Sequence, residues 1–180
     1  MNTRSLAIFA IAPLAAVALG ITQEPEMAKP GPEHETLKMD EGTWTATVKF
    51  WTAPDAPPQE AKGTEVNKLT LDGFWMVSDV TEDGGPYRAH AIVGYDTMKK
   101  KYVHSSVDNM MPVLHLMEGS FDKSKKTFTW TGEGPDMMGT MVKKRTVVTY
   151  PDANTRMVVA YSTGADGKET KSMEIAYKRK

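Results

Sequence analysis

The sequence predicts an all-β protein, an antiparallel up-and-down β-barrel of about ten strands preceded by a short N-terminal helix. Three observations indicate this class. Apolar and polar residues alternate in many short runs, tight-turn sequences separate the runs, and no helical stretch is long enough for a crossover between parallel strands. A sheet of about ten twisted strands tends to close or to split, and closure removes its sticky edges. A two-sheet sandwich is the alternative.

The expected elements follow in order along the chain. Residues 32–39 carry acids at the start and Lys38 near the end, which favours one or two helical turns. In residues 44–51, Trp, Ala, Val and Phe alternate with Thr and Lys, which is the period of a strand. Further strands are expected at about 64–71, 73–81, 87–95, 101–108, 112–119, 126–132, 140–150, 155–162 and 169–177.

Turn sequences support these boundaries. Asp83-Gly84-Gly85, Asp152-Ala153-Asn154 and Asp166-Gly167 favour the tight turns of hairpins. Residues 95–102 and 121–128 share a pattern, in which an aromatic residue closes one strand, Asp opens the turn, and lysines precede the aromatic residue of the next strand. The pattern predicts a hairpin turn used twice.

The N-terminus has the features of a secretory signal peptide. Arg4 is followed by an almost wholly apolar run from Ser5 to Ile21, with small residues at Ala18 and Gly20. A retained membrane anchor is the alternative, but the run is near the short limit for spanning a bilayer and Pro13 interrupts it.

The predicted organisation is therefore a signal peptide at 1–20, a flexible linker rich in proline and charge at 21–32, and a barrel domain at 33–180. We expect export, to the periplasm or out of the cell, with no stable membrane anchor after cleavage.

Composition excludes several classes of function. The chain has 180 residues, with 22 Lys and Arg against 23 Asp and Glu, so it lacks the broad basic field of a nucleic-acid-binding protein. It has no cysteine, which excludes disulfides, thiolate metal sites, iron–sulfur clusters and a cysteine nucleophile. Serine-nucleophile elbows and zinc-protease helices are absent too, and Gly132-Glu133-Gly134 is interpreted as a turn because it opens no helix.

A short helix followed by Gly42-Thr43-Trp44 and a meander of strands resembles the lipocalin-like, or calycin, superfamily. More closely, the chain is similar to a bacterial family named domain of unknown function 1579, from about Glu33 to Lys180. The segments that carry this likeness are 42–51, Gly94-Tyr95-Asp96 with Lys101-Tyr102, Asp108-Asn109-Met110, and 173–179. The resemblance implies a barrel and carries no established reaction or ligand.

Haem is disfavoured as a cofactor. Related nitrobindin-like barrels hold haem through a histidine late in the chain, whereas all four histidines here (His34, His90, His104 and His115) precede residue 116. We therefore expect no cofactor.

Polar residues in the 101–109 strand are candidates for a site inside the barrel. Tyr102, His104, Ser106 and Asp108 share one face, but neither face is clearly apolar, so alternation does not say which one points inward. His90 and His115, on the neighbouring strands, could then lie near His104. Such a cluster suits a general base, a metal site or a hydrogen-bonding floor. Residues of the rim or the outer face are the alternative.

Two further sets are candidates. Arg145 facing inward with Tyr161 could hold a ligand carboxylate, whereas facing outward it would belong to a basic edge. Thioether and imidazole ligands suit Cu(I), and methionines gather around one histidine in mid-chain. The candidate copper ligands are Met110, Met111, His115, Met117, Met137, Met138 and Met141, and apolar packing near the barrel mouth is the alternative.

The favoured function is binding of a small, mainly apolar ligand in the cavity, among Phe50, Phe128, the methionines and the residues predicted to contact it. The predicted contacts are Trp44, Phe74, His104, Asp108, His115, Trp130, Arg145 and Tyr161. The alternatives are an enzyme that uses the His104/Asp108/His115 region, a Cu(I)-binding envelope protein, and an interaction module with a filled barrel. No catalytic residue and no oligomeric state is assigned.

Overall fold

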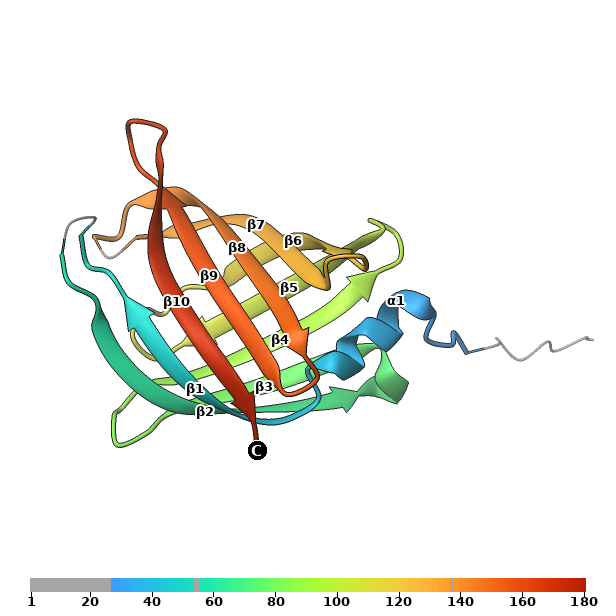
Figure 1. Ribbon diagram of the computed structural model, residues 1–180. Coiled ribbons are helices and arrows are strands. Elements are labelled where there is room, and N and C mark those ends of the chain that lie inside the picture. The colour runs from blue at the N-terminus through green and yellow to red at the C-terminus, as the bar shows by residue number, and fades with distance from the viewer. Residues whose placement is uncertain (1–26, 54–55, 137) are drawn as a thin grey trace, which may run out of the picture.

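A computed structural model describes residues 27–53, 56–136 and 138–180 of the chain. Within these residues, ten antiparallel strands close into one barrel, which confirms the predicted fold class and excludes the sandwich (Figure 1). The elements are α1 (Pro32–Glu35), the 3₁₀ turns η1 (Thr36–Met39) and η2 (Leu71–Gly73), β1 (Gly42–Phe50), β2 (Gln59–Thr70), β3 (Trp75–Glu82), β4 (Arg88–Asp96), β5 (Lys101–Asp108), β6 (His115–Asp122), β7 (Thr127–Pro135), β8 (Met141–Asp152), β9 (Thr155–Thr163) and β10 (Glu169–Arg179). The predicted signal peptide and the first part of the predicted linker lie outside the described residues.

Each strand pairs with its neighbours in the chain, and the barrel closes where the first strand meets the last. Trp44 of β1 lies opposite Arg179 of β10, and Phe50 lies opposite Met173. Closure leaves no free sheet edge among the described strands, which removes the template for edge-to-edge aggregation. No helix within the described ranges is long and apolar enough to cross a membrane.

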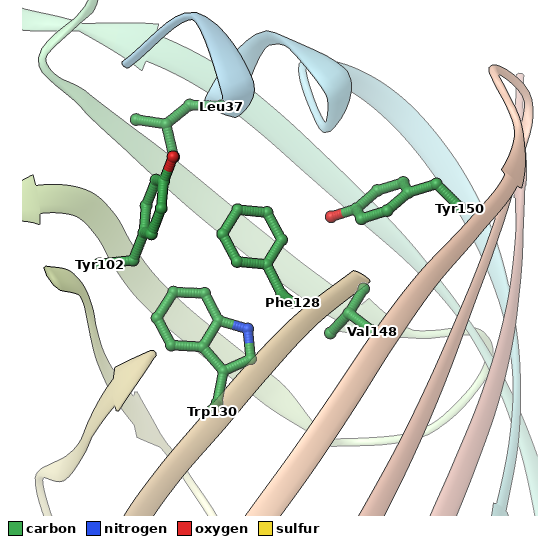
Figure 2. Packing of buried hydrophobic residues seen from close by; sticks show 6 residues of the cluster. All are labelled: Leu37, Tyr102, Phe128, Trp130, Val148 and Tyr150. Carbon is green, nitrogen blue, oxygen red and sulfur yellow. The ribbon is translucent and has the colours of Figure 1, made fainter. Parts of the chain in front are cut away.

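The two ends of the barrel differ. α1 and η1 lie across one end, whereas the β9–β10 hairpin extends from the opposite end (Figure 1). Beneath the helical segment is an aromatic cluster in which the rings of Tyr102 and Phe128 are 4.8 Å apart and those of Phe128 and Trp130 are 5.3 Å apart. Figure 2 shows Phe128 in the middle of this cluster, with Leu37 of η1 above it. This packing makes the helical end the closed floor of the barrel.

Some strand boundaries differ from those predicted. β6 begins at His115, three residues later than expected, because residues 109–114 form a loop in which Val113 donates to the carbonyl of Met111. Gly132-Glu133-Gly134 is part of β7, so its interpretation as a turn is wrong. A Cβ at position 132 would lie 2.4 Å from the carbonyl oxygen of Leu116 on β6, so glycine here permits a close approach of two strands.

The repeated turn pattern is confirmed. Oδ1 of Asp96 accepts hydrogen bonds from the backbone of Met98 and Lys99, and Oδ1 of Asp122 accepts them from Ser124 and Lys125. In both turns the residue before the next strand is a lysine in the left-handed region, with φ of 53° at residue 100 and 47° at residue 126. The aspartate satisfies the turn's amides, so the two hairpins have the same geometry.

Candidate functional site

A buried network of charged groups seals the floor. Arg156 of β9 donates to Oδ1 of Asp40 at 2.8 Å and to Oε1 of Glu65 at 2.7 Å. Asn67 donates to the same Glu65 oxygen at 2.7 Å, and the hydroxyl of Tyr150 donates to Oδ2 of Asp40 at 2.7 Å. The side chains of Arg156 and Glu65 are only 7% and 9% exposed. The network therefore ties β2, β8 and β9 to the segment that follows η1.

Attraction between Arg156 and the two carboxylates offsets the cost of burying their charges. Burial alone would raise the pKa of Glu65, but the charge of Arg156 and the hydrogen bonds from Arg156 and Asn67 outweigh burial and hold that pKa below its ordinary value. Burial opposes the charged form of Arg156, yet Asp40 and Glu65 raise its pKa above the ordinary value. Burial raises the pKa of Tyr150 well above the usual range, and the charge of Asp40 adds to this rise. Arg156 and Glu65 therefore remain an ion pair at neutral pH.

Trp44 belongs to this floor. Its side chain is fully buried, and its ring centroid lies 5.0 Å from the guanidinium carbon of Arg156 and 4.1 Å from that of Arg179. The indole Nε1 donates to the carbonyl of Asp40 at 2.8 Å. Arg179 donates to the carbonyls of Met39 and Glu41. Trp44 therefore has no exposed surface with which a ligand could make the predicted contact.

Small side chains line much of the other half of the barrel interior, which we call the lumen. In the closed half, many inward positions carry Tyr, Phe, Trp or Met, whereas towards the open end many carry Ala, Gly, Ser or Thr. The small inward-facing residues are Ala61, Gly63, Ala89, Ala91, Ser106, Gly132, Gly134, Thr146, Ala160 and Ser162. A barrel of eight strands is just filled by its own side chains, so a wider barrel with small side chains leaves free space. Ala91, Ser106 and Ala160 face inward and are nevertheless only partly buried, which indicates that the lumen is open to solvent.

His104 projects into this lumen from β5. Its ring lies 5.8 Å from that of Trp130, and its Nδ1 is buried with no hydrogen-bond partner. Burial lowers the pKa of His104; the charge of Glu65 works against that decrease and His115 adds to it. The imidazole is therefore neutral at pH 7 and can exchange one hydrogen bond with a bound molecule.

Asp108 and His115 also face the lumen, nearer the open end. Oδ2 of Asp108 lies 3.9 Å from Nε2 of His115, and the two side chains are 17% and 22% exposed. Oδ1 of Asp108 accepts hydrogen bonds from the backbone of Met110 and Met111, both at 2.8 Å. Tyr102 lies in the core, and Asp108 is on the same face of β5. This face of β5 therefore points inward, which alternation alone did not decide.

Arg145 and Tyr161 lie on the outer face of the barrel, not in the lumen. They are paired across β8 and β9, and Arg145 is an odd number of residues from the inward, buried Val148. Glu169 already occupies the guanidinium, accepting from Nε at 2.9 Å and from Nη2 at 2.7 Å, while the Tyr161 ring centroid is 4.1 Å away. The inward placement considered from the sequence is therefore wrong.

Two other candidates lie away from the lumen. The exposed side chain of His90 contacts the carboxyl group of Asp79 on the outer face, so it does not join His104. Phe74 follows η2 and packs edge-on against His34 of α1, with ring centroids 5.0 Å apart. It therefore belongs to the helical cover of the floor.

The methionines divide between lumen and rim. Met117 faces the lumen opposite His104 and packs against the aromatic cluster. Met110, Met138 and Met141 lie at the open end and are 72%, 88% and 62% exposed, respectively. Met111 is partly buried in the β5–β6 loop, and Met137 lies outside the described residues.

Sequence reasoning missed Lys144 and Arg156, both of which face inward. Lys144 alternates with Thr146 and Val148 along β8, and it is half-buried. Arg156 has the same relation to Val158 along β9. Alternation offered a signal for both, because each charged residue lies an even number of positions from an inward apolar residue of the same strand.

The outer face also carries a broad hollow, of about 850 Å³, over β3 to β10. Trp75, Ile92, Val103 and Leu116 contribute its apolar surface, with Lys143 and Glu169 among its charged residues.

Comparisons with known proteins identify a family for this chain. The family model described as a protein of unknown function, DUF1579, matches residues 29–179, which confirms the family resemblance seen in the sequence. No curated protein matches. Among solved structures, a redesigned β-barrel named b11L5F_LGL is 12% identical with a TM-score of 0.39, covering 85% of this chain and 99% of its own. The structure of EF1p2_mFAP2b bound to DFHBI is 11% identical with a TM-score of 0.40, covering 82% of this chain and 99% of its own.

Proposed function

We propose that this chain, which belongs to the DUF1579 family of proteins of unknown function, binds a small, mainly apolar ligand in the lumen of its barrel. One observation carries the proposal: small inward-facing residues leave the open half of the lumen unfilled above a sealed floor. Ala91 of β4 and Ala160 of β9 stand on opposite walls, five strands apart in a ring of ten described strands. The free width between them is available to a ligand.

The lumen wall has the chemistry of an apolar binding site. Val80, Val93, Met117, Val158 and Ile175 face inward and are partly buried, so their remaining exposed surface would be covered by a ligand. Burial of apolar surface contributes about 25 cal/mol per Å². A few polar groups then fix the orientation of such a ligand.

His104 offers that ligand a polar group above the floor network. Its imidazole lies beside Trp130, and one of its ring nitrogens has no partner within the protein. A ligand group that donates or accepts a hydrogen bond there would give Nδ1 of His104 the partner that it lacks. This hydrogen bond would fix the orientation of the ligand, whose affinity comes mainly from apolar burial.

Two measurements test the proposal. Native mass spectrometry of the protein purified from its own host reports a retained molecule directly. Titration with the neutral fluorescent probe N-phenyl-1-naphthylamine reports whether the lumen accepts an apolar molecule, and we expect saturable binding. Absence of both a retained molecule and saturable probe binding would refute the proposal.

Matched tryptophan variants locate the binding. Ala91→Trp fills the lumen and should abolish probe binding, whereas Ile92→Trp, one residue on and 47% exposed, should leave binding unchanged. Ala160→Trp fills the lumen from the opposite wall and serves if Ala91→Trp does not fold. Unchanged probe binding in a folded lumen variant would place the binding site elsewhere.

An enzymatic function is the second candidate, favoured by the inward Asp108–His115 pair. The present separation of 3.9 Å is too long for a hydrogen bond, and a shorter one would orient His115 as a general base. A retained molecule that changes mass on incubation with the wild-type protein, and does not with His115→Gln, would favour this candidate over simple binding.

We also propose that the protein is exported and that residues 1–20 are removed. The basic residue Arg4, the apolar run and the small residues at Ala18 and Gly20 support this proposal. The intact mass of protein recovered from outside the cytoplasm should lack these residues. A full-length mass in that fraction would instead favour a retained anchor.

A further inference from the structure

Two polar side chains from neighbouring strands meet at a glycine near the mouth of the lumen. Gly134 of β7 lies between β6 and β8 and is buried. A Cβ at this position would lie 3.2 Å from Nδ1 of His115 and 3.5 Å from Cε of Lys144. His115 and Lys144 therefore converge on the bare backbone of Gly134, in space that any other residue would fill.

Lys144 has no counter-ion there. No carboxylate among the described residues lies within 4.0 Å of its ammonium group. Burial lowers the pKa of Lys144, and only the more distant charges of Asp136 and Asp108 oppose that decrease. Both aspartates are already engaged, because an oxygen of each accepts two backbone N–H groups of its own loop. A half-buried ammonium without a close anion is electrostatically unsatisfied.

Apolar surface continues from this point down to the floor. Met117 follows His115 on the inward face of β6, and Thr146 and Val148 follow Lys144 on β8, with Trp130 between the two strands. The buried Val148 lies four positions after Lys144, a distance of about 13 Å along the strand. Because the strands are tilted, the depth of the lumen over this stretch is about 10 Å, which suits a ligand with an alkyl chain of medium length.

We propose that the ligand is an amphiphile with an acidic head group, which binds between Lys144 and His115 above Gly134 while its apolar body lies along Met117 and Trp130. This inference rests on the proposed function and names the chemical class of its ligand. The ammonium and the imidazole supply charge-assisted hydrogen bonds to the head group, while Oδ1 of Asp108 keeps its hydrogen bonds from the backbone of Met110 and Met111.

Competition between head groups on one alkyl chain tests the inference. Decanoate, 1-decanol and decylamine each displace N-phenyl-1-naphthylamine from the wild-type protein in separate titrations at pH 7. We expect decanoate to bind roughly 10- to 100-fold more tightly than 1-decanol, which is the strength of a hydrogen bond between charged groups. Decylamine should bind no better than the alcohol.

Variants of two adjacent lysines assign the effect. Lys144→Met should bind decanoate and 1-decanol equally while keeping its affinity for the alcohol, and Lys144→Arg should retain the preference for the acid. Lys143→Met is the matched control, because residue 143 faces outward and is exposed, and it should behave as wild type. Lys144→Met should also be no less stable without ligand, since methionine removes an uncompensated charge.

The outcomes separate the two proposals. Equal binding of acid and alcohol by the wild type, a preference retained in Lys144→Met, or tighter binding of decylamine would overturn the acidic head group and leave the apolar lumen intact. Failure of all three molecules and of the fluorescent probe to bind would overturn the lumen function itself, and this inference with it.

Discussion

Replacement of Arg156 by methionine tests whether the floor network holds the barrel closed. Arg156→Met keeps the apolar part of the side chain but leaves the carboxylates of Asp40 and Glu65 buried, 15% and 9% exposed, without their cation. Removing one partner of a buried ion pair costs about 4 kcal/mol. In a chain of this size that loss lowers Tm by about 10 °C.

The pH dependence of the variant is a sharper test. In the wild type, the lowered pKa of Glu65 contributes stability above its ordinary value of 4.5, and this contribution is lost as pH falls through the native-state pKa. In Arg156→Met, burial remains and the cation is gone, so the pKa of Glu65 rises above 4.5. The variant should therefore gain stability as pH falls from neutral towards 5, a range in which the Glu65 contribution to wild-type stability stays constant.

Urea unfolding followed by tryptophan fluorescence at several pH values measures both effects. Arg145→Met is the matched control, because it removes an arginine–glutamate pair on the outer face, where solvent screens it, and should leave the unfolding midpoint close to that of wild type. A loss in Arg156→Met no larger than that in the control, or a variant whose stability does not rise between pH 7 and pH 5, would refute the reasoning.

Three further predictions concern the turns, the close strand contact and the buried phenols. Lys126→Gly should increase the free energy of unfolding by about 1 kcal/mol in urea titrations, because residue 126 has a φ of 47°; Lys125→Gly should not. Gly132→Ala should lower it by about 1–3 kcal/mol, since the new Cβ would lie 2.4 Å from a backbone oxygen of β6, and an unchanged midpoint would contradict that contact. In an alkaline absorbance titration, Tyr150 and Tyr177 should ionise only when the barrel unfolds, because burial raises the pKa of both well above the ordinary value; ionisation while far-ultraviolet circular dichroism is unchanged would contradict their burial.

Most of the architecture was predictable because strands and turns are local features. The alternation around Trp44, the paired aspartate turns at residues 96 and 122, and the absence of a long helical run depend on residues near one another in the chain. Closure followed from the number of strands and the cost of free edges. The error at Gly132 had a local origin too, because a glycine that permits strand contact has the same sequence signal as a turn glycine.

The site was less predictable because it depends on which side of each strand faces the lumen. Along β5 both faces mix polar and apolar residues, so alternation gave no direction for His104 until Tyr102 was placed in the core. Arg145 and Lys144 are adjacent, similar in charge and opposite in direction, and only the position of Val148 in the core distinguishes them.

By itself, the sequence determined that this chain forms an antiparallel barrel, and approximately where its strands lie, because hydrogen-bonded strands and turns impose short-range patterns. Only the tertiary structure decided that Arg156 seals one end with Asp40 and Glu65, and that Lys144 and His115 meet over Gly134 at the other. These groups are brought together by the stagger and closure of the strands. Burial makes it costly to leave such polar and charged groups without partners, and they become buried only once the barrel has closed.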